Sequence, residues 1–202
     1  RTVETVTYAP HPESRFTKKG KRFFIQSLER HQDLTALLRE ITWVFNNPQT
    51  VEVVLYYKSN FRPFPNILTP LACAIEHLRE RGKTVRVIET YDEIEHCRYQ
   101  HPLTVKADYP ELNSPVGRVW RFDVPQDVYA IVENTIEYLS RRLLWEPGTL
   151  HSLEWSLYEL LDNVFQHSQV ERGYFMFQVQ QQKRRLSFAI ADQGCGIQES
   201  FR

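Results

Sequence analysis

The sequence has no excess of either charge, no long apolar run and only three cysteines among its 202 residues. Lysine plus arginine and aspartate plus glutamate number 25 each, so the net charge does not favour binding to nucleic acid or to a membrane surface. No apolar run reaches the roughly 20 residues of a membrane-spanning helix, and no signal peptide is visible. The cysteines form no CxxC pair, which indicates a reducing, cytoplasmic compartment.

Hydrophobic residues make up 42% of the chain and charged residues 25%, a composition typical of a globular rather than a disordered protein. The length suffices for one large domain or two small ones. We expect an irregular segment at 1–22, an α/β domain at 23–108, a proline-bearing linker at 109–116 and a second domain at 117–202. Because the chain begins with arginine rather than methionine, we also expect that residues before Arg1 are missing.

In the first domain, apolar and β-branched residues predict strands at 23–28, 51–57 and 84–88. Helical spacing predicts helices between them, at 33–45 and 67–81, and Gly82 is a good stop for the second helix. Strands that alternate with helices in this way predict parallel strands joined by right-handed crossovers.

In the second domain we expect a strand at 119–122, a helix capped by Asp127, and a second helix at 150–168 after the Pro147-Gly148 break. Strands at 174–180 and 186–191, joined by a polar loop, predict an antiparallel hairpin. The apolar positions of the first helix are Val128, Ile131, Val132, Thr135, Leu139 and Leu143.

The helix at 150–168 carries two stripes of residues. The polar stripe consists of Glu159, Asn163 and His167, which recur every fourth residue. Asparagine is a poor choice inside a helix unless its amide binds something. The apolar stripe consists of Leu153, Leu157, Leu160, Leu161 and Val164.

The last predicted strand runs directly into Asp192-Gln-Gly194-Cys-Gly196. The two glycines allow a tight turn and a close approach of the backbone to a ligand. Such a segment alone is more often a simple turn, but one hairpin before it lies the polar stripe of the helix. The pair of motifs therefore predicts a ligand site, with surface residues and a turn as the alternative.

The stretch from Glu159 to Ser168 resembles the asparagine box of the GHKL ATPases, which include sensor histidine kinases, gyrase and MutL. The segment from Asp192 to Ile197 resembles their first glycine box. The resemblance extends from about Asp127 to the end of the chain and implies a Bergerat-type α+β sandwich that binds ATP and Mg²⁺. It implies that Asn163 ligates the Mg²⁺, a cation that takes oxygen ligands.

The resemblance also implies roles for the other matched residues. Asp192 would accept a hydrogen bond from the adenine amino group, and Gly194 and Gly196 would let the backbone pass beside the base. Glu159 would be the general base of a kinase or ATPase. His167 would lie near the phosphates, although its place at a helix end is an equally good explanation.

Two features depart from the family pattern. Gln166 stands where many histidine kinases have lysine or arginine. No glycine-rich segment follows Ile197, so we expect the ATPase-like domain to be truncated before its lid and second glycine box. The chain should therefore bind ATP weakly, because the second box supplies backbone amides to the phosphates.

The first domain resembles the STAS-like domains of anti-anti-sigma factors, through the strand at 51–57 and the segment from Pro65 to Ala72 that opens a helix. In those proteins a phosphorylated serine lies at the start of the helix, where free amides favour a phosphate. The matching region here has Asn66 and Ile67, and Thr69 is the nearest hydroxyl.

These observations favour a bacterial, ATP-binding regulatory protein that resembles anti-sigma serine kinases and acts on a protein partner. The alternative is a nucleotide sensor or interaction module that transfers nothing, and Glu159 favours an enzyme over that alternative. A mechanochemical ATPase is disfavoured because no large downstream domain is visible. His96, Cys97 and His101 lack a fourth ligand at a suitable spacing for a metal site. We expect the hairpin edge to support self-association.

Overall fold

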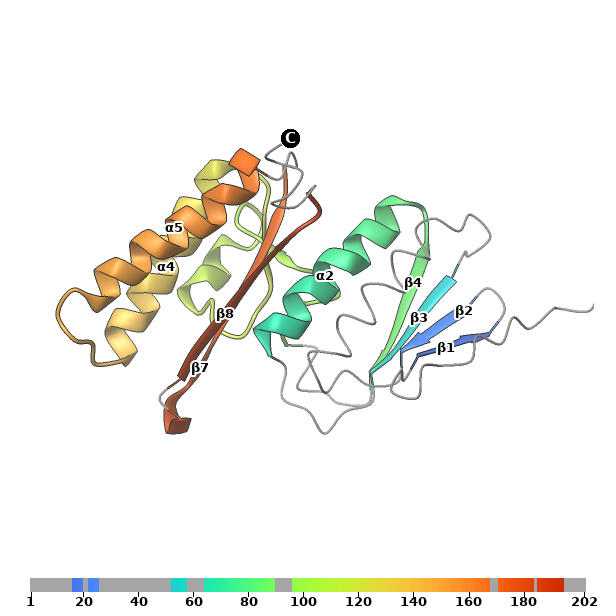
Figure 1. Cartoon of the computed structure of the whole chain (residues 1–202), viewed down its shortest axis with the longest axis horizontal. Coiled ribbons are helices and arrows are strands. Elements are labelled where there is room, and N and C mark those ends of the chain that lie inside the picture. The colour runs from blue at the N-terminus through green and yellow to red at the C-terminus, as the bar shows by residue number, and fades with distance from the viewer. Residues whose placement is uncertain are drawn as a thin grey trace, which may run out of the picture. The chain divides into compact units, whose positions relative to one another are not determined.

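The computed structural model describes residues 16–19, 22–25, 52–57, 64–89, 96–167, 171–183 and 185–194 (Figure 1). The chain divides into two compact units. Unit 1 comprises residues 1–63 and 74–96, and unit 2 comprises residues 64–73 and 97–202. The helix predicted at 33–45 lies outside the described residues.

Unit 1 contains a four-stranded sheet in the order β1-β2-β3-β4. Its strands are β1 (Phe16–Lys19), β2 (Arg22–Ile25), β3 (Glu52–Tyr57) and β4 (Thr84–Glu89). The predicted parallel pairing is confirmed for β2 with β3 and for β3 with β4. The expectation of an irregular segment was wrong for residues 16–19, because β1 extends the sheet by pairing antiparallel with β2, Phe16 opposite Ile25.

Helix α2 (Pro65–Glu80) begins two residues before the predicted start and ends at the predicted stop. Proline is well tolerated at the first helical position, where its missing N–H has no partner to lose. Gly82 adopts a φ of +72°, and the next N–H, of Lys83, donates to the Leu78 carbonyl at 3.0 Å. This is the Schellman arrangement, in which glycine supplies the left-handed backbone. The division between the two units falls inside α2, after Cys73.

Unit 2 contains a second four-stranded sheet, in the order β5-β6-β7-β8. Its strands are β5 (Leu103–Thr104), β6 (Trp120–Phe122), β7 (Gly173–Gln180) and β8 (Arg185–Asp192). The predicted strand at 119–122 and the antiparallel hairpin of β7 and β8 are both confirmed, and η2 (Gln181–Lys183) joins the two hairpin strands. The parallel pairing of β5 with β6 was not expected. Among the described residues β8 is an edge strand.

Helices α4 (Pro125–Arg142) and α5 (Thr149–His167) pack side by side and cover one face of β7 and β8 (Figure 1). Their apolar stripes form the core, as predicted, with one exception. Leu160 was expected in that stripe, but its side chain is 44% exposed, whereas the side chains of Leu157 and Leu161 are buried. The buried core residues include Val128, Ile131, Val132, Leu139, Leu157, Leu161, Val164, Phe175 and Phe177.

Asp127 was predicted to cap α4 at the residue before the helix, but the N-cap is Val124, three residues earlier. The helix starts at Pro125, so Asp127 lies in its first turn. From there its carboxylate accepts the backbone N–H of Asp123 at 2.9 Å and that of Val124 at 3.3 Å. A carboxylate at this place accepts hydrogen bonds from N–H groups that have no partner within the helix, and its negative charge interacts favourably with the positive end of the helix dipole.

The segment expected as a linker forms η1 (Tyr109–Asn113), a short 3₁₀ helix of unit 2. Leu112 is 1% exposed and belongs to the same core as α4 and α5. Beyond η1, Gly117 N–H donates to the Phe177 carbonyl at 2.8 Å, which ties the segment to β7. This proline-containing connection is therefore packed against the core of unit 2. Both units combine strands and helices, so the protein is of the mixed α/β class, as predicted. Within the described part of the chain, no helix has the length and apolar character to cross a membrane.

Candidate functional site

Two residues of the polar stripe of α5, Glu159 and Asn163, lie on the face of the helix away from the core. Glu159 and Asn163 are exposed and lie one helical turn apart, while Leu161 between them is fully buried. Asp162 and Gln166 hydrogen-bond to each other beside this stripe. His167 is the last residue of α5. The side chains of Glu159 and Asn163 are therefore available to a ligand from the same face of the helix.

Asp192 is the last residue of β8 and is exposed. Its Oδ1 accepts the backbone N–H of Gly194 at 2.7 Å, the local bond by which aspartate stabilises a turn. The neighbouring Gln193 donates through Nε2 to the carbonyl of Cys73, in the middle of α2, at 3.3 Å. The alternative interpretation of Asp192 as a turn residue is thus supported, although Oδ2 accepts no bond from a described residue. Gly196 lies outside the described residues.

The β-sheet register brings the two motifs to the same end of unit 2. Gly173, the first residue of β7, lies opposite Asp192 in β8 and opposite Phe122 in β6. Gly173 follows the end of α5 at His167 after only five intervening residues. The Phe122 ring also meets the ring of Phe165 from α5 edge to face, with centroids 5.7 Å apart. The end of α5 and the end of β8 therefore lie near each other (Figure 1).

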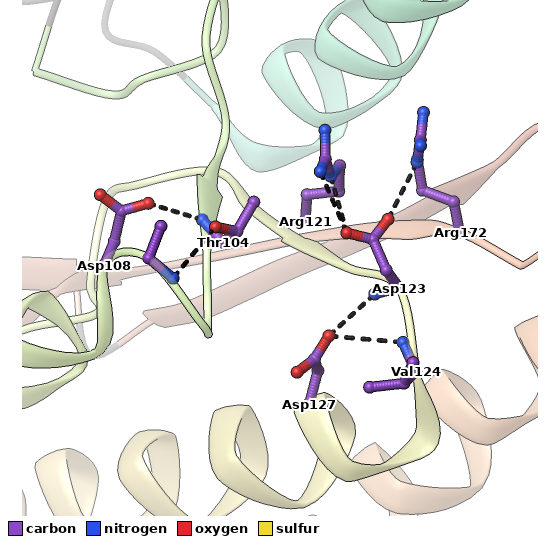
Figure 2. Close-up of polar contacts among 8 residues, drawn as sticks. Thr104, Asp108, Arg121, Asp123, Val124, Asp127 and Arg172 are labelled. Carbon is purple, nitrogen blue, oxygen red and sulfur yellow. Dashed lines mark hydrogen bonds and ion pairs between the residues drawn. The ribbon is translucent and has the colours of Figure 1, made fainter.

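A polar network that the sequence analysis missed lies at this same end (Figure 2). The Asp123 carboxylate accepts hydrogen bonds from two arginines. Arg172 Nε donates to Oδ1 at 2.9 Å, and Arg121 Nε donates to Oδ2 at 3.1 Å. The exposed fraction of the side chain is 26% for Arg121, 33% for Arg172 and 36% for Asp123. Asp123 and Arg172 are 49 residues apart in sequence, and no local pattern links them, so only the strand register reveals the pair.

A second, smaller set of bonds stabilises the β5 connection (Figure 2). The Asp108 carboxylate accepts the backbone N–H of Thr104 at 2.8 Å, and the Thr104 hydroxyl accepts the N–H of Ala107 at 3.4 Å. These contacts close one turn after β5 and involve none of the predicted site residues.

A cavity of about 80 Å³ lies between η1 and α4, with Asn113, Asn134, Glu137, Tyr138 and Arg142 in its lining. It contains none of the predicted site residues. Ligand pockets usually enclose about 300–1,000 Å³, so this cavity suits a few water molecules. Among the described residues, no group of three His, Cys, Asp or Glu side chains could hold a metal ion. A metal at Asn163 would therefore need ligand oxygens from a phosphate and from water.

Comparisons with protein-family models, with curated proteins and with solved structures found no match for this chain. The GHKL and STAS-like resemblances therefore stay predictions, the first based on the motifs of α5 and β8 and the second on the segments at 51–57 and 65–72.

Proposed function

We propose that the end of unit 2 formed by α5, β7 and β8 binds ATP together with Mg²⁺, and that the protein is a nucleotide-responsive regulator. The observation that supports the proposal is the register of β7 and β8. It puts Asp192 opposite Gly173, close in sequence to the end of the helix that carries Asn163. Two motifs separated by a hairpin thus come to one end of the unit, as a site with an adenine half and a phosphate half requires.

Each exposed residue has one role in this proposal. Asn163 supplies a carbonyl oxygen to Mg²⁺, whose remaining ligands are phosphate oxygens and water. Asp192 accepts a hydrogen bond from the adenine amino group through Oδ2, since Oδ1 is held by Gly194. His167 and Gly196 belong to the same site by the motif alone. The bound metal would neutralise charge on the phosphates, for which the described side chains offer few donors.

A nucleotide sensor without turnover is the favoured form of this proposal. Glu159 is exposed and accepts no hydrogen bond from a described residue. A general base must be held within hydrogen-bond reach of the proton it removes, and no described residue holds the Glu159 side chain in one position. Kinase or ATPase activity is the alternative, and it requires that Glu159 become ordered when a nucleotide and a protein partner bind.

The proposal is tested by titrating the chain with ATP and Mg²⁺ while its amide NMR signals are recorded. We expect weak binding, with a dissociation constant of about 1 mM, and shifts at Asn163, Asp192 and Gly194. Asn163→Ala should remove the Mg²⁺ dependence and leave the circular dichroism unchanged, because the side chain is exposed. Ser152→Ala, three turns earlier on the same helix, is the control and should bind as the wild type does.

Asp192→Asn keeps the size of the side chain but lets it present a donor to the adenine amino group. Hydrogen bonds to charged groups are worth roughly 1.5–3 kcal/mol, so ATP affinity should fall by about tenfold or more. GTP lacks that amino group and should bind the wild type more weakly than ATP. The proposal fails if ATP shifts no signal near Asn163 or Asp192, or if Asp192→Asn binds ATP as well as the wild type does.

A further inference from the structure

We infer that the Asp123–Arg172 ion pair is a positioning element that sets the spacing between the two halves of the proposed nucleotide site. This inference rests on the proposed function and adds residues to it that no motif identifies. Neither side chain contacts the nucleotide. Their effect is exerted through the start of β7, which stands between α5 and β8.

The pair joins three elements of unit 2 (Figure 2). Asp123 follows the last residue of β6, and Arg172 precedes the first residue of β7. On the α4 side, the Asp127 carboxylate accepts the backbone N–H of Asp123. The α4 terminus, the end of β6 and the start of β7 are therefore fixed to one another by charge-assisted hydrogen bonds, which are stronger than neutral ones.

The ion pair is directly linked to Asp192, the residue of the proposed adenine subsite. Arg172 is bonded covalently to Gly173, and Gly173 lies opposite Asp192 in the β7–β8 ladder. A shift of Arg172 along the strand direction would therefore move Gly173 and alter the position of Asp192. The half-buried ion pair opposes such a shift.

The ion pair is also linked, through aromatic packing, to the helix that carries the proposed phosphate-binding residue. Phe122, the residue before Asp123, is fully buried and lies opposite Gly173. Its ring packs edge to face on Phe165, two residues after Asn163 on α5. The same corner of the unit thus touches the helix that carries Asn163 and the strand that faces Asp192.

A ligand with two recognised ends depends on the distance between its subsites. Binding of one end raises the effective concentration of the other end only when both sites can be reached at once. A misplacement of about 1 Å can cost two orders of magnitude in an interaction that needs precise geometry. Loss of the ion pair should therefore weaken ATP far more than it weakens either part of ATP alone.

The experiment compares three ligands on the full chain: ATP with Mg²⁺, adenosine, and tripolyphosphate with Mg²⁺. For Arg172→Gln and for Asp123→Asn we expect about tenfold weaker binding of ATP. Adenosine and tripolyphosphate should each bind within about twofold of the wild type, because each needs only one subsite. Arg172→Lys, which keeps the charge, should recover part of the ATP affinity.

The control variant is Arg118→Gln, which removes another ion pair of unit 2, that of Arg118 with Glu111. It should leave all three affinities unchanged. Equal loss of all three ligands in Arg172→Gln and Asp123→Asn would mean a general structural role and would overturn the inference, as would unchanged ATP affinity. If the wild type itself fails to bind ATP, adenosine and tripolyphosphate, the proposed function is wrong and the inference falls with it.

Discussion

Replacing Gly173 by alanine should destabilise unit 2 by overpacking. A methyl group at this position would lie 2.8 Å from Cε1 of the Phe122 ring and closer still to Cε2 and Cζ. Carbon atoms in favourable contact are about 3.5–4.0 Å apart, so the ring or the strand would have to move by about 1 Å or more. Gly173 is not among the glycines with positive φ, and the clash alone therefore decides the outcome.

The ring of Phe122 has little room to move. Its side chain is 0% exposed and the Phe165 ring packs on it from α5. Extra atoms in a well-packed core typically cost about 1–3 kcal/mol, and the closeness of this contact puts Gly173→Ala at the upper end. A loss of about 3 kcal/mol would lower the Tm by about 10 °C for a domain of this size.

The assay is urea unfolding followed by circular dichroism, with thermal unfolding as a second measurement. Phe122→Leu, which shortens the side chain opposite Gly173, serves as the partner mutation. If the clash is the cause, the double variant should lose less free energy of unfolding than the sum of the two single variants, because residues in contact do not behave additively. A Gly173→Ala variant that unfolds at the wild-type urea concentration would refute the reasoning.

Three further predictions concern α4 and α5. Thr135 is 1% exposed and its hydroxyl has no hydrogen-bond partner among the described residues. Thr135→Val should therefore raise the free energy of unfolding measured in urea by about 1 kcal/mol, whereas Thr135→Ser should lower it. Asp127→Ala removes the acceptor for two backbone N–H groups and should cost about 1 kcal/mol, with Asp127→Asn less damaging. Burial, and then the carboxylates of Glu133 and Glu154 and the Tyr129 hydroxyl, raise the pKa of Tyr158 above its ordinary value of 10.0. The folded state therefore favours the neutral phenol of Tyr158. Its contribution to the free energy of unfolding is present below the unfolded-state pKa and is lost as the pH rises through the folded-state pKa. Tyr158→Phe should therefore lose less stability than the wild type between about pH 9 and pH 11 in urea unfolding.

Long elements with a strong period were predicted well from the sequence. The apolar spacing of α4 and α5 identifies both helices, and Gly82 identifies the end of α2. The limits of α2 and α5 were predicted to within about two residues, whereas α4 begins three residues before its predicted start. Period and turn chemistry are local properties, and local properties can be read from the order of residues alone.

Short strands and non-local pairs were not predicted. β5 has only two residues, too few to show a period, and it exists because the Leu103 N–H donates to the Val119 carbonyl at 3.0 Å. Likewise Asp123 and Arg172 meet only because β6 and β7 are neighbours. The exposure of Leu160 was not predicted either, because an apolar residue on a helix is buried only where a neighbouring element covers it, and the helix sequence does not contain that information.

For the candidate site, the sequence identified residue types and spacing, and the structure adds the strand register. The pattern of Glu159, Asn163 and Asp192 can be recognised in the sequence because it consists of particular residue types at fixed intervals along one helix and one strand end. The bond from Gly194 to Asp192 was not predicted, since a turn residue and a ligand-binding carboxylate have the same sequence signature.

Unit 2 is discontinuous in the chain, and this has a consequence for the order in which it forms. The start of α2 belongs to unit 2, yet the Gln193 side chain that bonds to Cys73 comes 120 residues later. At a synthesis rate of about 5–20 residues per second, the ribosome would add Gln193 to the chain about 6–24 s after Cys73. During that interval the first half of α2 lacks this hydrogen bond, so unit 2 is completed only after the β7–β8 hairpin has been synthesised.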